Sequence, residues 1–534
     1  MSFSKQWLQS PFFRGGLLFL LGASWCLGFA PLSWVYLQPL GLALAIAIAR
    51  APSEINAPTK IPIGFKAGFC YGFGQFSVGI HWLYISLHEF GEVPAAVAVL
   101  AVALLAAYMA LFPAMAFFIM RRLDQRWQGR LEPVTVKAVL FGMVWAVSEY
   151  ARAWVFTGFP WLTSGEAWLD TPFSGWYPLI GNYGLCFALG FFAFCLASLL
   201  SGLRATTGVR ARLLILMLPL AFFAGAGQLM VPLSWGAEKA GQVSVHIIQP
   251  NVSQTVKFDP QHITENFLST VDLGRLAGEH SKPGDWLMFP ETALPVLWQE
   301  APQSWRDAFA GLAFVYQTPV VMGAALQDGN IYTNSVIALP VTSPNAPDHP
   351  SDRYDKRHLV PFGEFIPLGF RWFVDLMNMP MGDFNRGQGA PSAFQVSGLN
   401  ILPNVCYEDV FSHEFAALVS SATPEPNVLF NVSNLAWFGQ SWALEQHAQM
   451  SRVRSAEHRK PTVRATNTGV SGVIDANGQW VMSMQSHARL VGKADLVGMK
   501  GLTPYARLGL FAPIFFALLV LAFAFAVSRP RQVQ

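Results

Sequence analysis

Long apolar stretches dominate the first 236 residues of the chain, and one more lies near its C-terminus. An α-helix needs about 20 mainly apolar residues to cross the hydrocarbon core of a bilayer. Eight stretches approach that length: residues 12–30, 34–50, 63–86, 93–120, 134–154, 179–201, 211–231 and 508–528. Glycines recur inside them, which suits helices that pack closely in lipid. The pattern predicts a polytopic α-helical membrane domain with about eight spans.

The pattern changes between the seventh and eighth stretches. Short apolar runs typical of strands occur at residues 243–248, 285–289, 320–323, 335–339, 399–405, 428–432 and 470–474. Helical patterns at residues 262–277 and 445–457 alternate with them, which predicts an α/β domain. We therefore expect a seven-span transmembrane domain over 1–236, a water-facing domain over 237–500, and an eighth span with a cytoplasmic tail over 501–534.

Composition and charge agree with this division. Of the 534 residues, 53% are hydrophobic and 13% are charged, against roughly 25% charged in soluble proteins. An ordinary soluble chain and a disordered one are both excluded. Residues 237–500 carry a net charge of −6 and the two flanks together +9. The overall charge of +3 is too small to predict a nucleic-acid partner.

The positions of Lys and Arg predict an orientation in the membrane. With the N-terminus inside, 15 of the basic residues flanking the spans fall on the cytoplasmic side, and Arg152 and Arg507 fall outside. Cytoplasmic loops of membrane proteins are enriched in Lys and Arg. Both termini are therefore predicted to be cytoplasmic and the α/β domain to lie outside.

Two aromatic segments each allow two interpretations. Residues 149–177 are dense in Trp, Phe and Tyr, typical either of an interfacial aromatic belt or of the wall of a lipid-access site. In the second case Glu149 and Arg152 would form a structural pair or contact a lipid headgroup. Residues 362–384 are either buried core or, as we favour, a lid against the bilayer. The residues proposed to line its lipid channel are Phe365, Phe370, Trp372 and Phe373, with Trp298, Trp437 and Phe258 as further wall residues.

Three residues of the central block stand where an apolar run meets a polar turn or a charge cluster. They are Glu291 in MFPETALP, Lys356 in RYDKRHLVPFGEF and Cys406 in NILPNVCYEDVF. Taken singly, each has an ordinary structural interpretation: a capping carboxylate, a solvated lysine and a buried small thiol. The other four cysteines lie in predicted spans, so Cys406 is the one thiol of the water-facing block. No Cys/His pattern has metal-ligand spacing.

Together these three motifs resemble the Glu-Lys-Cys triad of the nitrilase superfamily. The run from Asn431 to Gly478 also resembles the superfamily's pattern after the nucleophile. With the eight spans and the GFPWL segment at 158–162, the whole chain resembles the apolipoprotein N-acyltransferases of Gram-negative bacteria, the membrane-embedded branch of that superfamily. The resemblance implies an αββα sandwich for the central domain.

The resemblance also implies a reaction and its participants. A fatty acyl chain passes from a phospholipid, through a thioester on Cys406, to the N-terminal amine of a diacylglyceryl-cysteine apolipoprotein. This is the last step of lipoprotein maturation. Glu291 is implied as general base, Lys356 as oxyanion donor, Glu364 and Glu408 as orienting carboxylates, and Tyr407 as a packing partner of the thioester. No cofactor or metal is implied, and we expect a monomer in the bacterial inner membrane with a periplasmic catalytic domain.

Two alternatives remain open from the residues alone. A membrane-tethered amidase acting on small amides would explain the triad but would need one anchor rather than eight spans. A transporter with a sensory extracytoplasmic domain would explain the spans. The predicted spans, however, contain almost no buried ionisable residues, and Glu149 and Arg152 lie at the end of a span.

Overall fold

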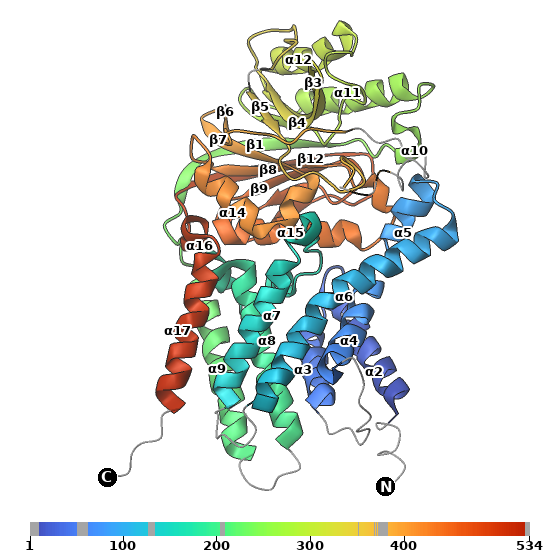
Figure 1. Cartoon of the computed structure of the whole chain (residues 1–534). Helices are drawn as coiled ribbons and strands as arrows, with labels where there is room; N and C mark the ends of the chain where they lie inside the picture. The colour runs from blue at the N-terminus through green and yellow to red at the C-terminus, as the bar shows by residue number, and fades with distance from the viewer. Residues whose placement is uncertain are drawn as a thin grey trace. The chain divides into compact units, whose positions relative to one another are not determined.

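The computed structural model describes residues 10–50, 62–126, 134–202, 209–350, 352–367, 369, 371 and 383–528. The chain divides into two compact units (Figure 1). The first comprises Met1–Tyr84, Ala95–Leu233 and Leu510–Gln534. The second comprises Ile85–Pro94 and Ser234–Gly509. The domain limits expected from the sequence stay a prediction.

The first unit is helical. Its main helices are α2 (Pro11–Ala23), α3 (Leu37–Arg50), α4 (Ile63–Gly79), α6 (Ala95–Arg126), α7 (Val134–Ala151), α8 (Tyr177–Gly202), α9 (Val209–Met230) and α17 (Phe511–Ser528). Each predicted apolar stretch overlaps one of these helices. Within the described residues, four segments are long and apolar enough to cross a membrane: Pro11–Gly28, Ala95–Gln125, Val134–Ala151 and Ser174–Ser201. The number of spans therefore remains a prediction.

Glycines allow the helices of this unit to approach closely. A Cβ atom at Gly74 of α4 would lie 2.0 Å from the carbonyl oxygen of Phe19 in α2. One at Gly72 would lie 2.4 Å from the ring of Pro113 in α6. Any larger residue would push these helices apart, so the expected role of the glycines is confirmed.

The third apolar stretch was predicted too long. Helix α4 ends at Gly79, and α5 (Leu83–Ile85) and the π-turn η2 (Ser86–Phe90) follow. The segment Ile85–Pro94 belongs to the second unit. Within that unit the Ser86 hydroxyl donates to the carbonyl oxygen of Trp437 at 2.7 Å, and the rings of Phe90 and Trp437 meet edge to face. Hydropathy alone does not distinguish a lipid-facing helix from an apolar segment that packs on protein.

The second unit contains two six-stranded sheets. The first has the order β12-β1-β2-β3-β4-β5, and the second β11-β10-β9-β8-β7-β6. The strands of the first are β1 (Glu238–Gln249), β2 (Trp286–Met288), β3 (Val320–Asp328), β4 (Ile331–Leu339), β5 (Asp352–Asp355) and β12 (Leu490–Lys500). Those of the second are β6 (Phe394–Val396), β7 (Leu399–Val405), β8 (Val428–Ser433), β9 (Thr462–Thr466), β10 (Gly472–Ile474) and β11 (Trp480–Ser483). Each of the seven predicted strand runs overlaps one of these strands, whereas β5, β6, β9, β11 and β12 were not predicted.

The two sheets share one pairing pattern. Strands β1, β2 and β3 are parallel, as are β7, β8 and β9, and the remaining pairs in both sheets are antiparallel. The carboxyl ends of neighbouring parallel strands meet at one edge of a sheet. Residues that follow β7 and β8 are therefore held close together at one edge of the second sheet. Residues that follow β2 lie at the corresponding edge of the first sheet.

Helices cover both outer faces of the paired sheets (Figure 1). They are α11 (Ile263–Glu279) and α12 (Gln303–Tyr316) on one face, and α14 (Ser412–Ser421) and α15 (Ala443–His458) on the other. The short helix α10 (Gln254–Lys257) contacts α11, and α16 (Pro504–Leu508) contacts α14 and α15. Along β2, Trp286 and Met288 pack into the core between the sheets, whereas Leu287 and Phe289 pack into the core under α11 and α12. This period-2 alternation is what a sheet buried on both faces requires. An α/β domain with two sheets is thus confirmed.

Candidate active site

Cys406 occupies a sharp turn directly after strand β7. It opens the 3-10 turn η6 (Cys406–Val410), and its φ of +49° lies in the left-handed region. A non-glycine residue rarely adopts that conformation, and such strain clusters at functional sites. The residue is partly exposed while the next four are buried. The turn therefore presents the thiol at the end of a central strand.

Glu291 follows strand β2 and is nearly buried. One carboxylate oxygen accepts a hydrogen bond from the Asn434 backbone N–H, and the other accepts one from the Asn334 side chain, both at 2.6 Å. The Lys257 ammonium donates to the Glu291 carbonyl oxygen at 3.2 Å. Burial raises the pKa of the Glu291 carboxyl, the charge of Glu364 adds to the rise, and Lys356 opposes it. A raised pKa is what a carboxylate needs to accept a proton from a thiol.

Lys356 follows strand β5 and is 1% exposed. Its ammonium lies 2.9 Å from one oxygen of Glu364 and 2.8 Å from the other. Burial lowers the pKa of this ammonium, but the charges of Glu364, Glu291 and Cys406 outweigh burial and raise it above its ordinary value. Lys356 therefore stays protonated in the site.

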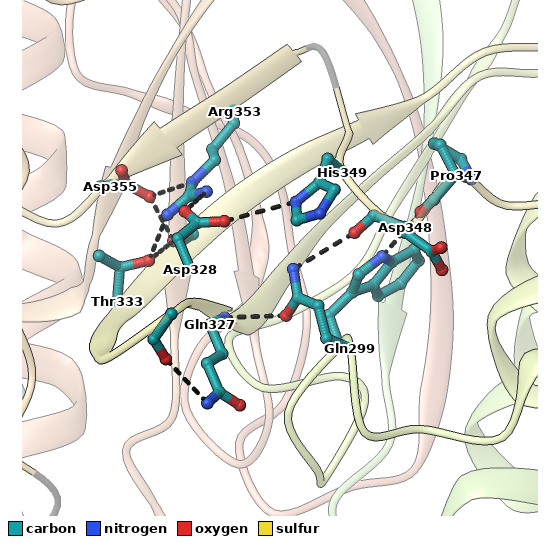
Figure 2. A network of polar contacts seen from close by, with 12 residues as sticks. Gln299, Gln327, Asp328, Thr333, Pro347, Asp348, His349, Arg353 and Asp355 are labelled. Carbon is teal, nitrogen blue, oxygen red and sulfur yellow. Dashed lines mark hydrogen bonds and ion pairs between the residues drawn. The ribbon is translucent and has the colours of Figure 1, made fainter.

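An ion-pair network fixes the strand that carries Lys356. Figure 2 shows Arg353 of β5 between Asp328, Asp355 and Thr333. The Arg353 Nε lies 2.6 Å from Asp355, and one of its terminal nitrogens donates to the Thr333 hydroxyl at 2.8 Å. Because Asp328 is the last residue of β3 and Thr333 is the third residue of the return strand β4, this guanidinium connects the short edge strand to the neighbouring hairpin.

The thiol of Cys406 keeps its proton in this arrangement. Burial and the charge of Glu291 raise the pKa of Cys406 to about 12, while Lys356 opposes the rise. The sulfur, the carboxylate and the ammonium thus act on one another electrostatically, so the structure brings together the three residues predicted from the sequence. A nucleophilic attack must then be coupled to transfer of the thiol proton, and Glu291 is the acceptor at hand.

The supporting carboxylates have separate partners. Glu364 accepts from Lys356, from the Asn334 side chain at 2.6 Å and from the Val360 backbone N–H at 2.8 Å. Asn334 therefore bridges Glu291 and Glu364, a role that sequence analysis missed. A polar residue inside a strand whose neighbours are buried, as in IYTNSVIAL, was the available signal. Asn434, also missed, stands directly after β8 at the edge where the strand ends gather.

Glu408 joins the loop of Lys356 to the turn of Cys406. Its carboxylate accepts from the backbone N–H groups of Val405 and Arg357, both at 2.7 Å, and from the Tyr354 hydroxyl at 2.9 Å. Burial raises the pKa of this carboxyl, and the two backbone donors oppose the rise. Tyr407 packs edge to face on Phe411 with ring centres 5.0 Å apart. Glu408 thus orients the backbone beside Lys356 rather than its ammonium.

Glu408→Gln is expected to lower the free energy of unfolding by about 1–3 kcal/mol, because an amide nitrogen replaces one of two buried acceptor oxygens and leaves donors unsatisfied. The melting temperature of the detergent-solubilised chain measures this change. Glu265→Gln, on the exposed face of α11, is the matched control and should leave the melting temperature unchanged. Equal melting temperatures for the two variants would contradict the bridging role.

The residues proposed for a lipid-channel wall have mixed outcomes. Trp298 is fully buried in the core under α11 and α12, and its indole N–H donates to the Pro347 carbonyl oxygen, so a wall position is wrong for it. Phe258 is 47% exposed and Trp437 is 37% exposed. Phe365 is partly exposed beneath the Arg386 guanidinium, 5.4 Å from its ring centre. Phe370, Trp372 and Phe373 lie outside the described residues.

Glu149 and Arg152 form a buried ion pair in the first unit. The Arg152 guanidinium also donates to the carbonyl oxygens of Trp161 at 2.7 Å and Phe159 at 3.2 Å. Both side chains are at most 3% exposed. These contacts tie the pair to the loop around 159–163. Of the two roles suggested from the sequence, they favour the structural pair over the headgroup contact.

The described residues contain no group of three His, Cys, Asp or Glu side chains placed to hold a metal ion. Two sheets between helices, with a glutamate, a lysine and a cysteine brought together at strand ends, define the carbon–nitrogen hydrolase class of enzyme domain. The family model of the carbon–nitrogen hydrolases matches residues 247–499, and that of the apolipoprotein N-acyltransferase N-terminal domain matches residues 21–195.

Full-length relatives give the more particular assignment. The apolipoprotein N-acyltransferase of Ralstonia nicotianae is 38% identical, covering 97% of this chain and 94% of its own. That of Bordetella bronchiseptica is 36% identical, covering 97% of both chains. The chain belongs to the apolipoprotein N-acyltransferase family. A solved CN-hydrolase superfamily protein from Xanthomonas campestris is 17% identical over 48% of this chain and 91% of its own, with a TM-score of 0.34, and adds nothing to that assignment.

Proposed function

We propose that this chain transfers a fatty acyl group from a membrane phospholipid to the N-terminal amine of a diacylglyceryl-cysteine apolipoprotein, through a thioester on Cys406. The observation that carries the proposal is the electrostatic cluster of Cys406, Glu291 and Lys356, in a chain of this family that has apolar helices long enough for a bilayer. A thioester divides one difficult acyl transfer into two easier ones.

In the first half-reaction the Cys406 sulfur attacks the carbonyl carbon of the phospholipid ester. Glu291 takes the thiol proton as the C–S bond forms, which its raised pKa favours. The Lys356 ammonium stabilises the negative charge that develops on the carbonyl oxygen. The ester C–O bond then breaks, Glu291 returns the proton to the glycerol oxygen, and a lyso-phospholipid leaves.

In the second half-reaction the α-amine of the apolipoprotein attacks the thioester carbon. Glu291 accepts a proton from the nitrogen as the N–C bond forms, and Lys356 again meets the charge on oxygen. The C–S bond breaks, and the proton passes from Glu291 to the Cys406 sulfur. No external energy source is needed, because the acyl group starts in an ester and ends in a more stable amide.

The membrane placement is part of the proposal. We infer eight spans, both termini in the cytoplasm and a catalytic domain on the periplasmic face of the inner membrane. The distribution of Lys and Arg along the sequence supports this orientation. We also infer a monomer, and access of lipid along the partly exposed aromatic residues Phe365, Phe258 and Trp437.

Intact-protein mass spectrometry after incubation with a dioleoyl glycerophospholipid tests the proposal. One oleoyl group should appear on Cys406, should be released by hydroxylamine, and should disappear when a diacylglyceryl lipopeptide is added. Lyso-phospholipid should form in equal amount. Release of ammonia from simple amides without any lyso-phospholipid would instead indicate an amidase and would refute acyl transfer.

A further inference from the structure

The backbone of Cys406 is held by a buried network outside the triad. The Cys406 carbonyl oxygen lies 3.0 Å from Nε2 of His447, and the Asn431 side-chain amide lies 3.5 Å from it. His447 stands on helix α15 and is 1% exposed. A left-handed backbone at a non-glycine residue persists only where surrounding contacts hold it. The contact to His447 is such a restraint.

Both ring nitrogens of His447 have defined roles. A carbonyl oxygen only accepts, so Nε2 must carry the hydrogen and donate it to Cys406. Arg464 lies 3.0 Å from Nδ1, and because a guanidinium only donates, Nδ1 must accept. Burial and the charge of Arg464 lower the pKa of His447 well below its usual value. The imidazole is therefore neutral and fixed in one tautomer.

Arg464 is itself fixed from several sides. It is fully buried on strand β9, and its guanidinium faces the Asp409 carboxylate at 3.4 Å, the Asn431 side-chain oxygen at 3.3 Å and the Ser451 hydroxyl. Its Nε donates to the Val470 carbonyl oxygen at 3.1 Å. Asp409 belongs to the same turn as Cys406. The network therefore holds this turn at two points, the Cys406 carbonyl oxygen and the Asp409 carboxylate.

We propose that His447, held in one tautomer by Arg464, is a positioning residue that fixes the left-handed backbone of Cys406 and so aims its sulfur at the acyl carbon. It acts through Cys406 and touches neither substrate. The inference rests on the proposed function only in taking a phospholipid as the acyl donor. The role of the Cys406 thiol as the nucleophile does not depend on which donor is used. Misplacement of a reacting atom by about 1 Å costs on the order of 10²-fold in rate.

His447→Leu and His447→Gln, made in the full chain in detergent, form the test. Glutamine carries a terminal N–H₂ donor for the Cys406 carbonyl, whereas leucine has similar bulk and no donor. The rate of Cys406 acylation is measured with a dioleoyl glycerophospholipid and, in parallel, with a p-nitrophenyl ester. Both the concentration of the acyl donor and the pH are varied. The p-nitrophenyl signal is corrected with Cys406→Ala.

His447→Leu is expected to lower the maximal acylation rate about 10²-fold with the half-saturating donor concentration unchanged, because positioning of the nucleophile affects the chemical step. His447→Gln should recover to within about tenfold of the original chain. The pH dependence should be the same in all three, since His447 stays neutral. Arg464→Lys, which keeps the charge but loses the planar fork facing Nδ1, should show the same kind of loss.

Several results would overturn the inference. The first is a maximal acylation rate in His447→Leu equal to that of the original chain. The second is an effect of His447→Leu on the half-saturating donor concentration alone. The third is a His447→Gln variant as slow as His447→Leu although the two melt at the same temperature. If His447→Leu fails to fold, an unimpaired Arg464→Lys with an unchanged melting temperature overturns it instead. A chain that is acylated on Cys406 by the p-nitrophenyl ester but never by phospholipid refutes the proposed function and leaves this test intact.

Discussion

Cys406→Ala is expected to lose acyl transfer to a lipopeptide by a factor on the order of 10⁴ or more, since removing a covalent nucleophile leaves only binding and oxyanion stabilisation. No other thiol lies in residues 237–500 of the sequence. The loss should be in the maximal rate, with no acyl group retained on the protein. N-acylated lipopeptide measured by mass spectrometry over time gives the rate.

Cys70→Ala provides the matched control for this thiol. Cys70 is partly exposed on α4 of the first unit and takes no part in the site. Its replacement should leave both the acyl-enzyme and the product rate unchanged. A loss of about tenfold or less is what removing a single contact costs, not what removing a nucleophile costs. If the Cys406→Ala chain still N-acylates at a rate within about tenfold of the original, the acyl group travels by another route.

The triad and the frame around it could be predicted from the sequence because each has a local signal. The apolar stretches overlap helices, the seven strand runs overlap strands, and Glu291 and Cys406 each follow a predicted run. Lys356 was predicted from its motif alone, because the short strand β5 before it was not predicted. A residue that directly follows a buried strand reaches the edge of the sheet whatever the rest of the fold does. Motif and periodicity were therefore sufficient for these parts.

Partners brought in from distant strands could not be predicted in the same way. Asn334 bridges Glu291 and Glu364 but stands in no recognised motif. Asn434 lies in the run that resembles the superfamily's pattern, yet that resemblance does not indicate that its backbone N–H donates to Glu291. The common pairing pattern of the two sheets was also invisible, because hydrogen-bonded backbones need no similarity of side chains. Trp298 looked like a channel residue because aromatic side chains serve equally as core.

The placement of Ile85–Pro94 shows a second limit. The segment continues an apolar pattern, but in the second unit Ser86 donates to the Trp437 carbonyl oxygen and Phe90 packs on its ring. Trp437 stands three positions after Asn434, whose N–H holds the Glu291 carboxylate. The segment between α4 and α6 thus contacts the loop that carries Asn434 and Trp437, beside the proposed base Glu291. The sequence pattern gives no sign of this contact.

Lys356→Met is expected to lower the rate of Cys406 acylation by about 10²–10³-fold at neutral pH, the usual cost of losing a donor to a developing oxyanion. A second effect follows from charge. Lys356 lowers the pKa of Glu291, so its removal lets burial and Glu364 raise that pKa further. Glu291 must be ionised to accept the thiol proton. The acid limb of the pH–rate profile should therefore move to higher pH, and activity should partly recover as the pH rises.

Two further variants separate the charge of Lys356 from its shape. Lys356→Arg retains a cation between Glu291 and Glu364, so its acid limb should stay where it is in the original chain even though the broader guanidinium lowers the rate. Adding Glu364→Gln to Lys356→Met removes the like charge that raises the pKa of Glu291, so the limb should return part of the way. Stopped-flow release of lyso-phospholipid at several pH values measures all of these profiles. An unmoved limb in Lys356→Met would mean that Glu291 is not the group whose ionisation controls acylation, because the charge most responsible for holding its pKa down would have been removed without effect.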